Sequence, residues 1–133
     1  MVFESHHDNP MQQIADFIIR FRNLRGSRLK VRNTKWSRGI LGVLESSNYL
    51  SYKIISRDLK YIEIDIISNS IRSMKLCSKG SRVMYLGYKD LLRDSRLKKT
   101  SGFYILTTSE WGLITSFEAL RLGVGGKVLL KVE

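Results

Sequence analysis

The chain has 133 residues, of which 43% are hydrophobic and 10% aromatic, so its composition argues against a disordered chain and predicts one domain or two small lobes. Its 23 Lys and Arg residues outnumber its 12 Asp and Glu residues, and the resulting net charge of +11 favours a polyanionic partner, either nucleic acid or an anionic membrane surface. The single cysteine, Cys77, excludes an internal disulfide, and the only histidines, His6 and His7, could not form a metal triad by themselves, so we expect no metal or other cofactor.

The first part of the chain predicts two helices separated by a short strand. Residues 10–21 carry apolar side chains at helical spacing, with Asn9 as the helix cap. Residues 29–31 alternate apolar and basic side chains, which is typical of a short strand. Thr34 is expected to cap a second helix that ends near Asn48. No apolar run in the sequence approaches the roughly 20 residues that a membrane-spanning helix needs.

The rest of the chain predicts mainly strands. Residues 88–93 indicate a helical turn, and Thr115 with Glu118 matches a capping box that opens one short helix. The pattern turns extended from Tyr49, with alternation of polar and apolar residues over 61–66. Further extended segments that we expect are 70–85 (two strands around a turn at Gly80-Ser81), 103–106, 113–114 and 127–132.

Acidic residues are unevenly spaced along the chain. None falls within residues 17–44 or 66–89, although these segments hold eight and five basic residues respectively. If acidic residues were placed at random, some would fall within segments this long and offset their positive charge. Their absence favours polyanion binding over an ordinary solvated face. The first helix has the pattern of a core helix rather than of a basic amphipathic membrane helix, which favours nucleic acid over a membrane surface.

Two short motifs have both a structural and a functional interpretation. The glycines of 123–127 follow a helix and precede a strand, the reverse of a phosphate-binding loop, so we expect a helix C-cap and a close turn there. The hydroxyl run 107–109 suits an ordinary turn, and it equally suits contacts to RNA phosphate and ribose. Nucleophilic catalysis by these hydroxyls would need a base, and no histidine lies outside the N-terminal tail. We therefore expect no enzymatic activity.

A few aromatic and basic residues could either bind RNA or have a purely structural role. Tyr85 and Trp111 are the aromatic residues best placed to stack on bases, although aromatic residues at strand positions more often belong to a core. Arg20, Arg22 and Asn23 at the end of the first helix either hold phosphate or are simply solvated.

Two groups of motifs carry a resemblance to a known family. The N-terminal group is Pro10, Ile14-Ala15-Asp16, Arg20-Phe21-Arg22-Asn23, Asn48-Tyr49-Leu50, and Ser78-Lys79 with Arg82 and Tyr85. The C-terminal group is Gly102, Ile105, Leu106, Thr107-Thr108-Ser109, Gly112, Ile114-Thr115, Glu118-Ala119 and Gly125-Gly126. Their order from about residue 9 to 132 resembles the family of small-subunit ribosomal protein eight, in its bacterial or organellar branch.

The resemblance implies an α+β fold in two lobes. After a tail of residues 1–8, an N-terminal lobe (9–68) would pack two helices on a small sheet. A C-terminal lobe (69–133) would be mostly β with one short helix and would carry most of the rRNA-binding surface. Two departures from the family pattern bear on this surface. Trp111 is one extra residue that either stacks or bulges the loop, and Lys127 stands where the family often has Glu.

The resemblance also implies that the chain binds a helical junction of small-subunit rRNA and recognises the shape and the sugar-phosphate backbone of the RNA. The residues that we expect to contact RNA are Arg20, Arg22, Asn23, Lys35, Lys79, Arg82, Tyr85, Thr107, Thr108, Ser109, Glu118, Gly125, Gly126 and Lys127.

The sequence thus predicts a structural constituent of the small ribosomal subunit that binds central-domain rRNA and supports assembly beside neighbouring ribosomal proteins. The Ile- and Ser-rich composition and divergent loops favour a mitochondrial ribosome, with a plastid or the bacterial cytoplasm as alternatives. Glu4 and Asp8, with no arginine among the first eight residues, are unlike a transit or signal peptide. The competing hypothesis is a free-standing basic RNA-binding protein outside the ribosome.

Overall fold

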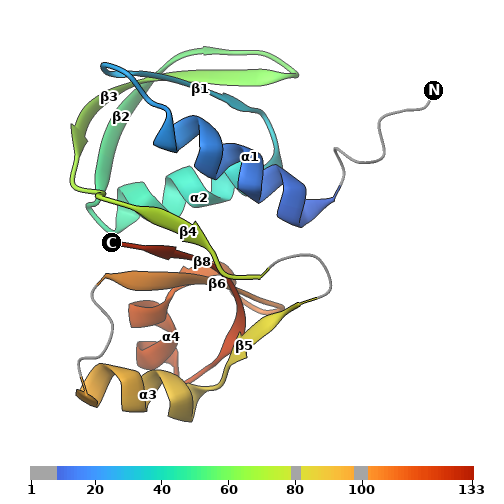
Figure 1. The fold of residues 1–133 in the computed structure, drawn as a ribbon, viewed down its shortest axis with the longest axis vertical. Helices are drawn as coiled ribbons and strands as arrows, with labels where there is room; N and C mark the ends of the chain where they lie inside the picture. The colour runs from blue at the N-terminus through green and yellow to red at the C-terminus, as the bar shows by residue number, and fades with distance from the viewer. Residues whose placement is uncertain (1–8, 79–81, 98–101) are drawn as a thin grey trace. The chain divides into compact units, whose positions relative to one another are not determined.

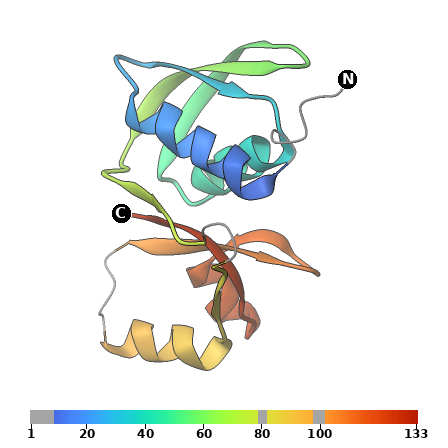
Figure 2. The ribbon, with the colours of Figure 1, turned by 45° about the vertical axis from the view of Figure 1, so that its right-hand side comes forward.

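The computed structural model describes residues 9–78, 82–97 and 102–133, which form two compact units, Met1–Ile71 and Arg72–Glu133. Both units combine helices with an antiparallel sheet, so the fold class is α+β, as predicted (Figures 1 and 2). Among the described residues, no helix is both long and apolar enough to cross a membrane.

The first unit contains two helices and three strands. They are α1 (Pro10–Arg22), β1 (Arg28–Arg32), α2 (Lys35–Ser46), β2 (Leu50–Arg57) and β3 (Tyr61–Asn69). The strands pair antiparallel in the order β1-β3-β2, so the last strand of this unit lies in the middle of its sheet.

Local sequence signals explain both helices of this unit. The Asn9 side chain accepts the backbone N–H groups of Met11 and Gln12, and Pro10 occupies the first helical position, where no N–H is needed. The Thr34 hydroxyl accepts the Ser37 N–H at 3.0 Å and caps α2. Both predicted caps are therefore confirmed.

Alternation along the strands places one face of this sheet in the core of the unit. In β1 and the first half of β3, every second residue is buried with the inner faces of both helices, and the residues between them are mostly charged. In β2 only Leu50 is buried, and Ile54 and Ile55 are exposed. The buried residues of the unit include Ile14, Phe17, Ile18, Leu29, Val31, Ile40, Leu44, Leu50, Ile62 and Ile64.

The second unit contains five strands and two helices in the described residues. In chain order they are β4 (Met74–Leu76), β5 (Met84–Leu86), α3 (Tyr88–Leu97), β6 (Phe103–Thr108), β7 (Gly112–Thr115), α4 (Ser116–Leu122) and β8 (Gly126–Val132). The sheet order is β4-β8-β6-β7, with β5 also paired to β8. The core behind the sheet is built on Leu91, Leu106, Ile114, Ala119 and Val128.

Two details of this unit differ from the sequence prediction. The expected helical turn at 88–93 is a ten-residue helix, α3, so the unit has two helices rather than one. The strands expected as a hairpin within 70–85 do not pair with each other, because both run antiparallel to β8, one after the other along the same edge. The turn predicted at Gly80-Ser81 lies outside the described residues.

Candidate nucleic-acid interface

A surface hollow on the second unit gathers residues from separate segments of the chain. Its lining residues are Tyr85, Thr107, Thr108, Ser109, Glu110, Trp111, Val124, Gly125, Gly126 and Lys127, and its volume is about 500 Å³. We call it the glycine hollow. Seven of the fourteen residues predicted to contact RNA line it, and these seven come from both the Tyr85 strand and the last 30 residues.

Strand register explains why these residues meet. Tyr85 on β5 pairs with Lys127 on β8, and Lys127 pairs with Thr107 on β6, so the three side chains form one row across the sheet. Directly paired residues project from the same face. This face is open, since the Tyr85 side chain is 70% exposed. The alternate residues, Leu86 and Leu106 among them, point into the core and hold the strands in this register.

Two glycines form the floor of the hollow because there is no room for a side chain. A Cβ at Gly125 would lie 2.3 Å from the Leu86 carbonyl oxygen, and one at Gly126 would lie 2.7 Å from the Thr107 carbonyl oxygen. Both contacts are shorter than van der Waals contact allows, and both involve backbone atoms that hold the sheet together. The Gly-Gly pair is therefore required by the packing of β8 between β5 and β6, and it leaves bare backbone at the base of the hollow.

The hydroxyl run ends in a tight turn that Thr108 closes. Thr108 pairs with Gly112 across the β6–β7 hairpin, which leaves a three-residue loop, 109–111. The Thr108 Oγ1 accepts the Trp111 N–H at 2.9 Å and donates to the Gly112 carbonyl at 3.3 Å. Gly112 has a φ of +67°, the left-handed conformation that such a three-residue loop requires. The Thr108 hydroxyl thus shapes the loop, while the Ser109 side chain at its tip is exposed.

The short helix α4 supports the hollow from behind. Thr115 accepts the Glu118 N–H at 3.0 Å, as its half of the predicted capping box requires, while the Glu118 carboxylate pairs with Arg121. Gly123 ends the helix with a φ of +73°, which confirms the predicted C-cap. Glu118 lies on this helix and does not line the hollow.

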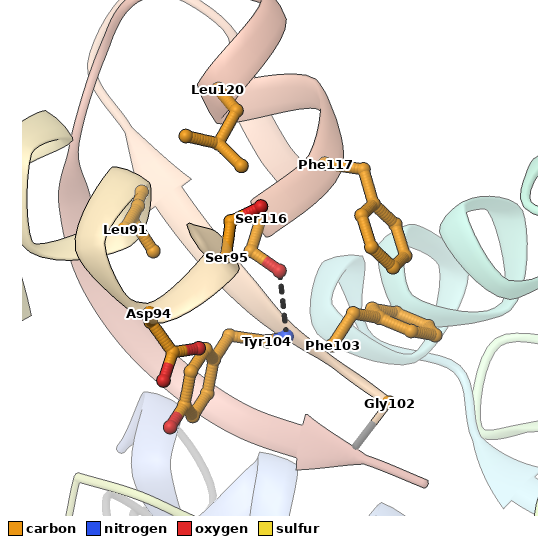
Figure 3. A pocket seen from close by; sticks show the side chains of 9 residues that line it. All are labelled: Leu91, Asp94, Ser95, Gly102, Phe103, Tyr104, Ser116, Phe117 and Leu120. Atoms are coloured by element: carbon orange, nitrogen blue, oxygen red, sulfur yellow. Dashed lines mark hydrogen bonds between the residues drawn. The ribbon is translucent and has the colours of Figure 1, made fainter. Parts of the chain in front are cut away.

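A second cavity, of about 320 Å³, lies between the two helices and β6 (Figure 3). Ser116 Oγ accepts the Tyr104 N–H at 3.0 Å there, and the rings of Phe103 and Phe117 stand 5.6 Å apart. These contacts fasten α4 to β6. Cys77 lies elsewhere in the same unit, half-buried, and burial raises the pKa of its thiol above the ordinary value.

Arg82 and Lys79 were predicted on the same surface as Tyr85. Arg82 is exposed and lines a different hollow, together with Leu76, Cys77, Val83 and Met84. Lys79 lies outside the described residues.

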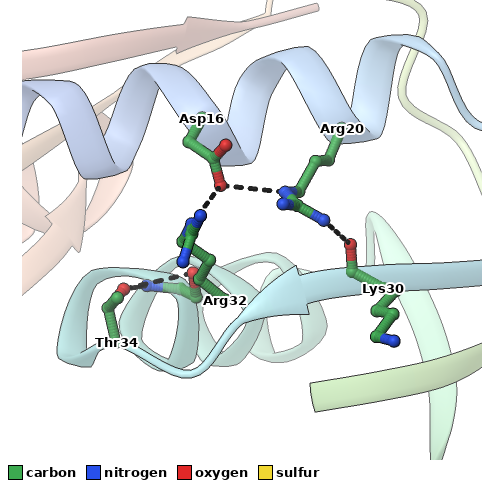
Figure 4. Close-up of polar contacts among 6 residues, drawn as sticks. Asp16, Arg20, Lys30, Arg32 and Thr34 are labelled. Carbon is green, nitrogen blue, oxygen red and sulfur yellow. Dashed lines mark hydrogen bonds and ion pairs between the residues drawn. The ribbon is translucent and has the colours of Figure 1, made fainter. Parts of the chain in front are cut away.

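In the first unit, Arg20 is held within the protein (Figure 4). Its guanidinium bonds the Asp16 carboxylate at 2.9 Å and donates to the Lys30 carbonyl at 3.2 Å. Asp16 also pairs with Arg32 at 3.8 Å. The Arg20 and Arg32 guanidinium carbons and the Lys30 ammonium lie 4.7–5.7 Å from the centre of the Tyr61 ring. Arg20 therefore joins α1 to the edge of β1.

The other predicted residues of the first unit are exposed. Arg22 lies in the last turn of α1 and Asn23 is its C-cap, with the Asn23 N–H bonded to the Ile19 carbonyl at 3.0 Å. Lys35 opens α2, and its ammonium stands 5.1 Å from the centre of the Trp36 ring. These residues belong to a different unit from the glycine hollow.

The structure adds residues to the hollow that the sequence-based set left out. Glu110, Trp111 and Val124 line it. Trp111 had a signal in the sequence, as an aromatic residue next to the hydroxyl run, whereas Glu110 had none. Within the described residues there is no group of three or more His, Cys, Asp or Glu side chains that would hold a metal ion.

Comparison with known proteins identifies the family of the chain. A family model for ribosomal protein S8 matches residues 12–132. Small ribosomal subunit protein uS8 of a Nitratiruptor species is 36% identical over 132 residues, covering 90% of this chain and 96% of the relative. Organellar relatives are similar as well. The uS8m protein of Acanthamoeba castellanii is 36% identical, covering 84% of this chain and 88% of the relative. The uS8c protein of Euglena longa is 31% identical, covering 90% and 95%.

The chain belongs to the ribosomal protein S8 family, as its sequence motifs predicted. This is a family of structural, non-enzymatic proteins, which confirms the expectation that the chain is not an enzyme.

Proposed function

We propose that this chain binds central-domain rRNA of the small ribosomal subunit through the glycine hollow and thereby supports subunit assembly. A structural role in the ribosome follows from the family, whose members compared above are named small ribosomal subunit proteins. The observation that carries the proposal is the convergence of seven predicted RNA-contact residues on one exposed hollow.

The chemistry of the hollow supports contacts to an RNA backbone. Lys127 supplies a cation, Ser109 an exposed hydroxyl, and Gly125-Gly126 a bare stretch of main chain that a sugar-phosphate backbone can approach closely. Such contacts recognise the shape of an irregular RNA helix without a code of base contacts. The exposed residues Arg22, Asn23 and Lys35 are proposed to meet a second rRNA segment.

The test is binding to small-subunit rRNA transcribed in vitro, measured with matched lysine variants. Lys127→Ala should weaken binding and reduce the slope of log affinity against log salt by about 1, the value for one phosphate contact. Lys53→Ala, which removes an exposed lysine from β2 in the other unit, serves as the control and should leave the slope unchanged. Equal behaviour of the two variants would count against the hollow as the binding surface.

We further propose that the ribosome concerned is mitochondrial. Bacterial and organellar relatives match at 31–36% identity, so this proposal rests on the composition and divergent loops of the chain. Blotting sucrose-gradient fractions from purified mitochondria tests both points. Co-migration with the mitochondrial small subunit supports the proposal. A signal only at the top of the gradient would favour a free-standing RNA-binding protein.

A further inference from the structure

We propose that the turn between β2 and β3, residues 58–61, is a docking site for another protein of the small ribosomal subunit. Leu59 at this turn enters an apolar pocket with an acidic rim on that partner. The inference goes beyond the proposed function, because it concerns the first unit and a protein partner rather than the RNA contacts of the glycine hollow.

The first argument is exposure. The Leu59 side chain is 96% exposed, the highest value among the exposed large apolar residues of the described chain. Ile54 and Ile55, on β2 just before the turn, are 54% and 43% exposed. Single exposed apolar residues are ordinary on a protein surface, whereas clustered ones mark interaction sites. Three of the six residues 54–59 are of this kind, so the end of this hairpin is a candidate contact surface.

The second argument is rigidity. The Asp58 Oδ1 accepts the N–H groups of Lys60 and Tyr61, and the Asp58 N–H bonds the Tyr61 carbonyl at 3.0 Å. From outside the turn, Asn33 donates its side-chain amide to the Asp58 carbonyl at 2.7 Å and its backbone N–H to the Lys60 carbonyl at 2.8 Å. These bonds fix the backbone on both sides of Leu59. A side chain presented from a fixed backbone loses less conformational freedom on binding, which favours affinity.

The third argument is the open edge of β2. In the sheet order β1-β3-β2, this strand pairs with β3 alone among the described strands. A bulge leaves Ile55 out of the ladder between Ile54 and Ser56. Bulges discourage a further strand from pairing along an edge. We therefore expect side chains, rather than an added strand or a second copy of this sheet, to make the contact.

The fourth argument is charge, which selects the kind of partner. Arg57 and Lys60 lie on either side of Leu59 and are exposed, while the Asp58 carboxylate accepts two backbone N–H groups of the turn. A surface that covers the turn must therefore bury a leucine between two cations. RNA would offset the charges but offers little apolar area to the leucine. A protein pocket lined by apolar residues and rimmed by Asp or Glu does both.

The first experiment asks which molecule covers Leu59. The photoreactive amino acid benzoylphenylalanine replaces Leu59 in the full chain, and small subunits that have incorporated this chain are purified and irradiated. We expect an adduct to one protein that survives ribonuclease digestion, with Asp or Glu residues in the crosslinked segment. An adduct to rRNA, or no adduct in assembled subunits, would overturn the inference.

The second experiment measures what the leucine contributes to binding of the crosslinked protein, once that protein is purified. Leu59→Ser should weaken its affinity for the full chain about 5- to 30-fold, the loss typical of an interface anchor. Leu59→Met should retain most of the affinity, and Lys60→Glu should slow association with an acidic surface. Ile19→Ser is the matched control, because Ile19 on α1 is also an exposed apolar residue of the first unit, at 53%. Equal losses for Leu59→Ser and Ile19→Ser would overturn the inference, as would no loss for Leu59→Ser.

Binding to isolated small-subunit rRNA separates this inference from the proposed function. Leu59→Ser should bind the rRNA with wild-type affinity, because a leucine makes no phosphate contact. Weaker rRNA binding by Leu59→Ser would place RNA at the turn and overturn the inference. A Lys127→Ala chain that binds rRNA as the wild type does would count against the glycine hollow and leave this inference standing.

Discussion

Gly126 shows how a single atom can decide whether the second unit packs. Its missing Cβ lets β8 approach β6 so closely that the Thr107 carbonyl oxygen lies only 2.7 Å from the position of a Cβ. A neighbouring backbone cannot move aside as a flexible side chain would.

Gly126→Ala should therefore lower the free energy of unfolding by about 1–3 kcal/mol, the usual cost of overpacking a close contact. Gly42→Ala is the matched control. It lies on the exposed face of α2 with nothing within 4 Å of the added Cβ, so it should stabilise the protein by up to about 1 kcal/mol through helix propensity. Urea unfolding followed by circular dichroism measures both. A stable Gly126→Ala protein would show that the strands can separate at no cost.

Asp58 is a residue whose ionisation is tied to a turn. In the β2–β3 connection its Oδ1 accepts the N–H groups of Tyr61 at 2.7 Å and Lys60 at 2.8 Å. These two hydrogen bonds, with smaller contributions from the charges of Lys30 and Lys60, hold the pKa of the Asp58 carboxyl below its usual value. The ionised form is thus favoured by folding.

A lowered pKa in the folded state gives a definite pH dependence. The stabilisation from ionised Asp58 should be complete above the unfolded-state pKa near 3.9 and should be lost as the pH falls through the lower folded-state pKa. An NMR titration of the Asp58 carboxyl carbon should give a midpoint below about 3.9. The stability difference between wild type and Asp58→Asn should shrink over the same acidic range. A midpoint above the ordinary value would contradict the role of the two hydrogen bonds.

Residue-scale predictions from sequence succeeded where the signal was local. Asn9, Thr34 and Gly123 act within a few residues of their own position, and each is found in its expected cap. The RNA contact expected of Arg20 stays a prediction, whereas its bonds to Asp16 and the Lys30 carbonyl could not be predicted, because they depend on packing between α1 and β1. Nothing in the spacing of charges along the chain indicates such a contact.

At the scale of elements, β4 and β5 follow one another along the same side of β8 (Figure 1). Cys77 continues the ladder with an N–H bond to the Leu129 carbonyl at 2.9 Å. At the next residue, Ser78, the side-chain hydroxyl makes hydrogen bonds that the backbone of a strand would otherwise make. Its buried hydroxyl donates to the Val128 carbonyl at 2.6 Å and accepts the Met84 N–H at 3.0 Å. One side chain thus joins the two strands across the residues between them.

Ser78→Ala should destabilise the second unit, because it leaves the Val128 carbonyl and the Met84 N–H without this partner. Each unsatisfied buried group costs about 1–3 kcal/mol. Ser46→Ala provides the control, since the Ser46 hydroxyl bonds the Val43 carbonyl at an exposed position on α2. Thermal unfolding should show a clear loss for Ser78→Ala and little change for Ser46→Ala. Equal melting temperatures would mean that water replaces the hydroxyl.

The sequence pattern predicted that both of these strands exist but not how they pair. Alternation of apolar and polar residues within 70–85 reports that a segment is extended, and adjacent strands joined by a short turn usually form a hairpin. The actual partner, β8, lies about 40 to 60 residues further along the chain, and period-2 patterning carries no information about a partner. The glycine hollow depends on this pairing, so its lining could be predicted only through the family resemblance.

At the scale of the whole molecule, the net charge of +11 dominates the expected behaviour with RNA. Binding to rRNA should weaken steeply with salt. If six to ten phosphates are contacted, affinity should fall by about 10³–10⁵ between 50 and 200 mM salt. Filter binding over this range measures the effect, and a flat response would contradict recognition led by phosphate contacts.

The position of β8 also sets an order of events during synthesis. This strand is the one to which β4, β5 and β6 all pair, yet it is the last of the strands to be made. A ribosome translating this chain releases β4, β5, β6 and β7 before β8, the strand that joins β4 and β5 to β6. Until β8 is made, the apolar faces of these strands cannot complete their core. The central strand of the first unit, β3, is likewise the last of its own unit, but that unit ends at Ile71. The first unit can therefore be fully folded while the sheet of the second still lacks its central strand.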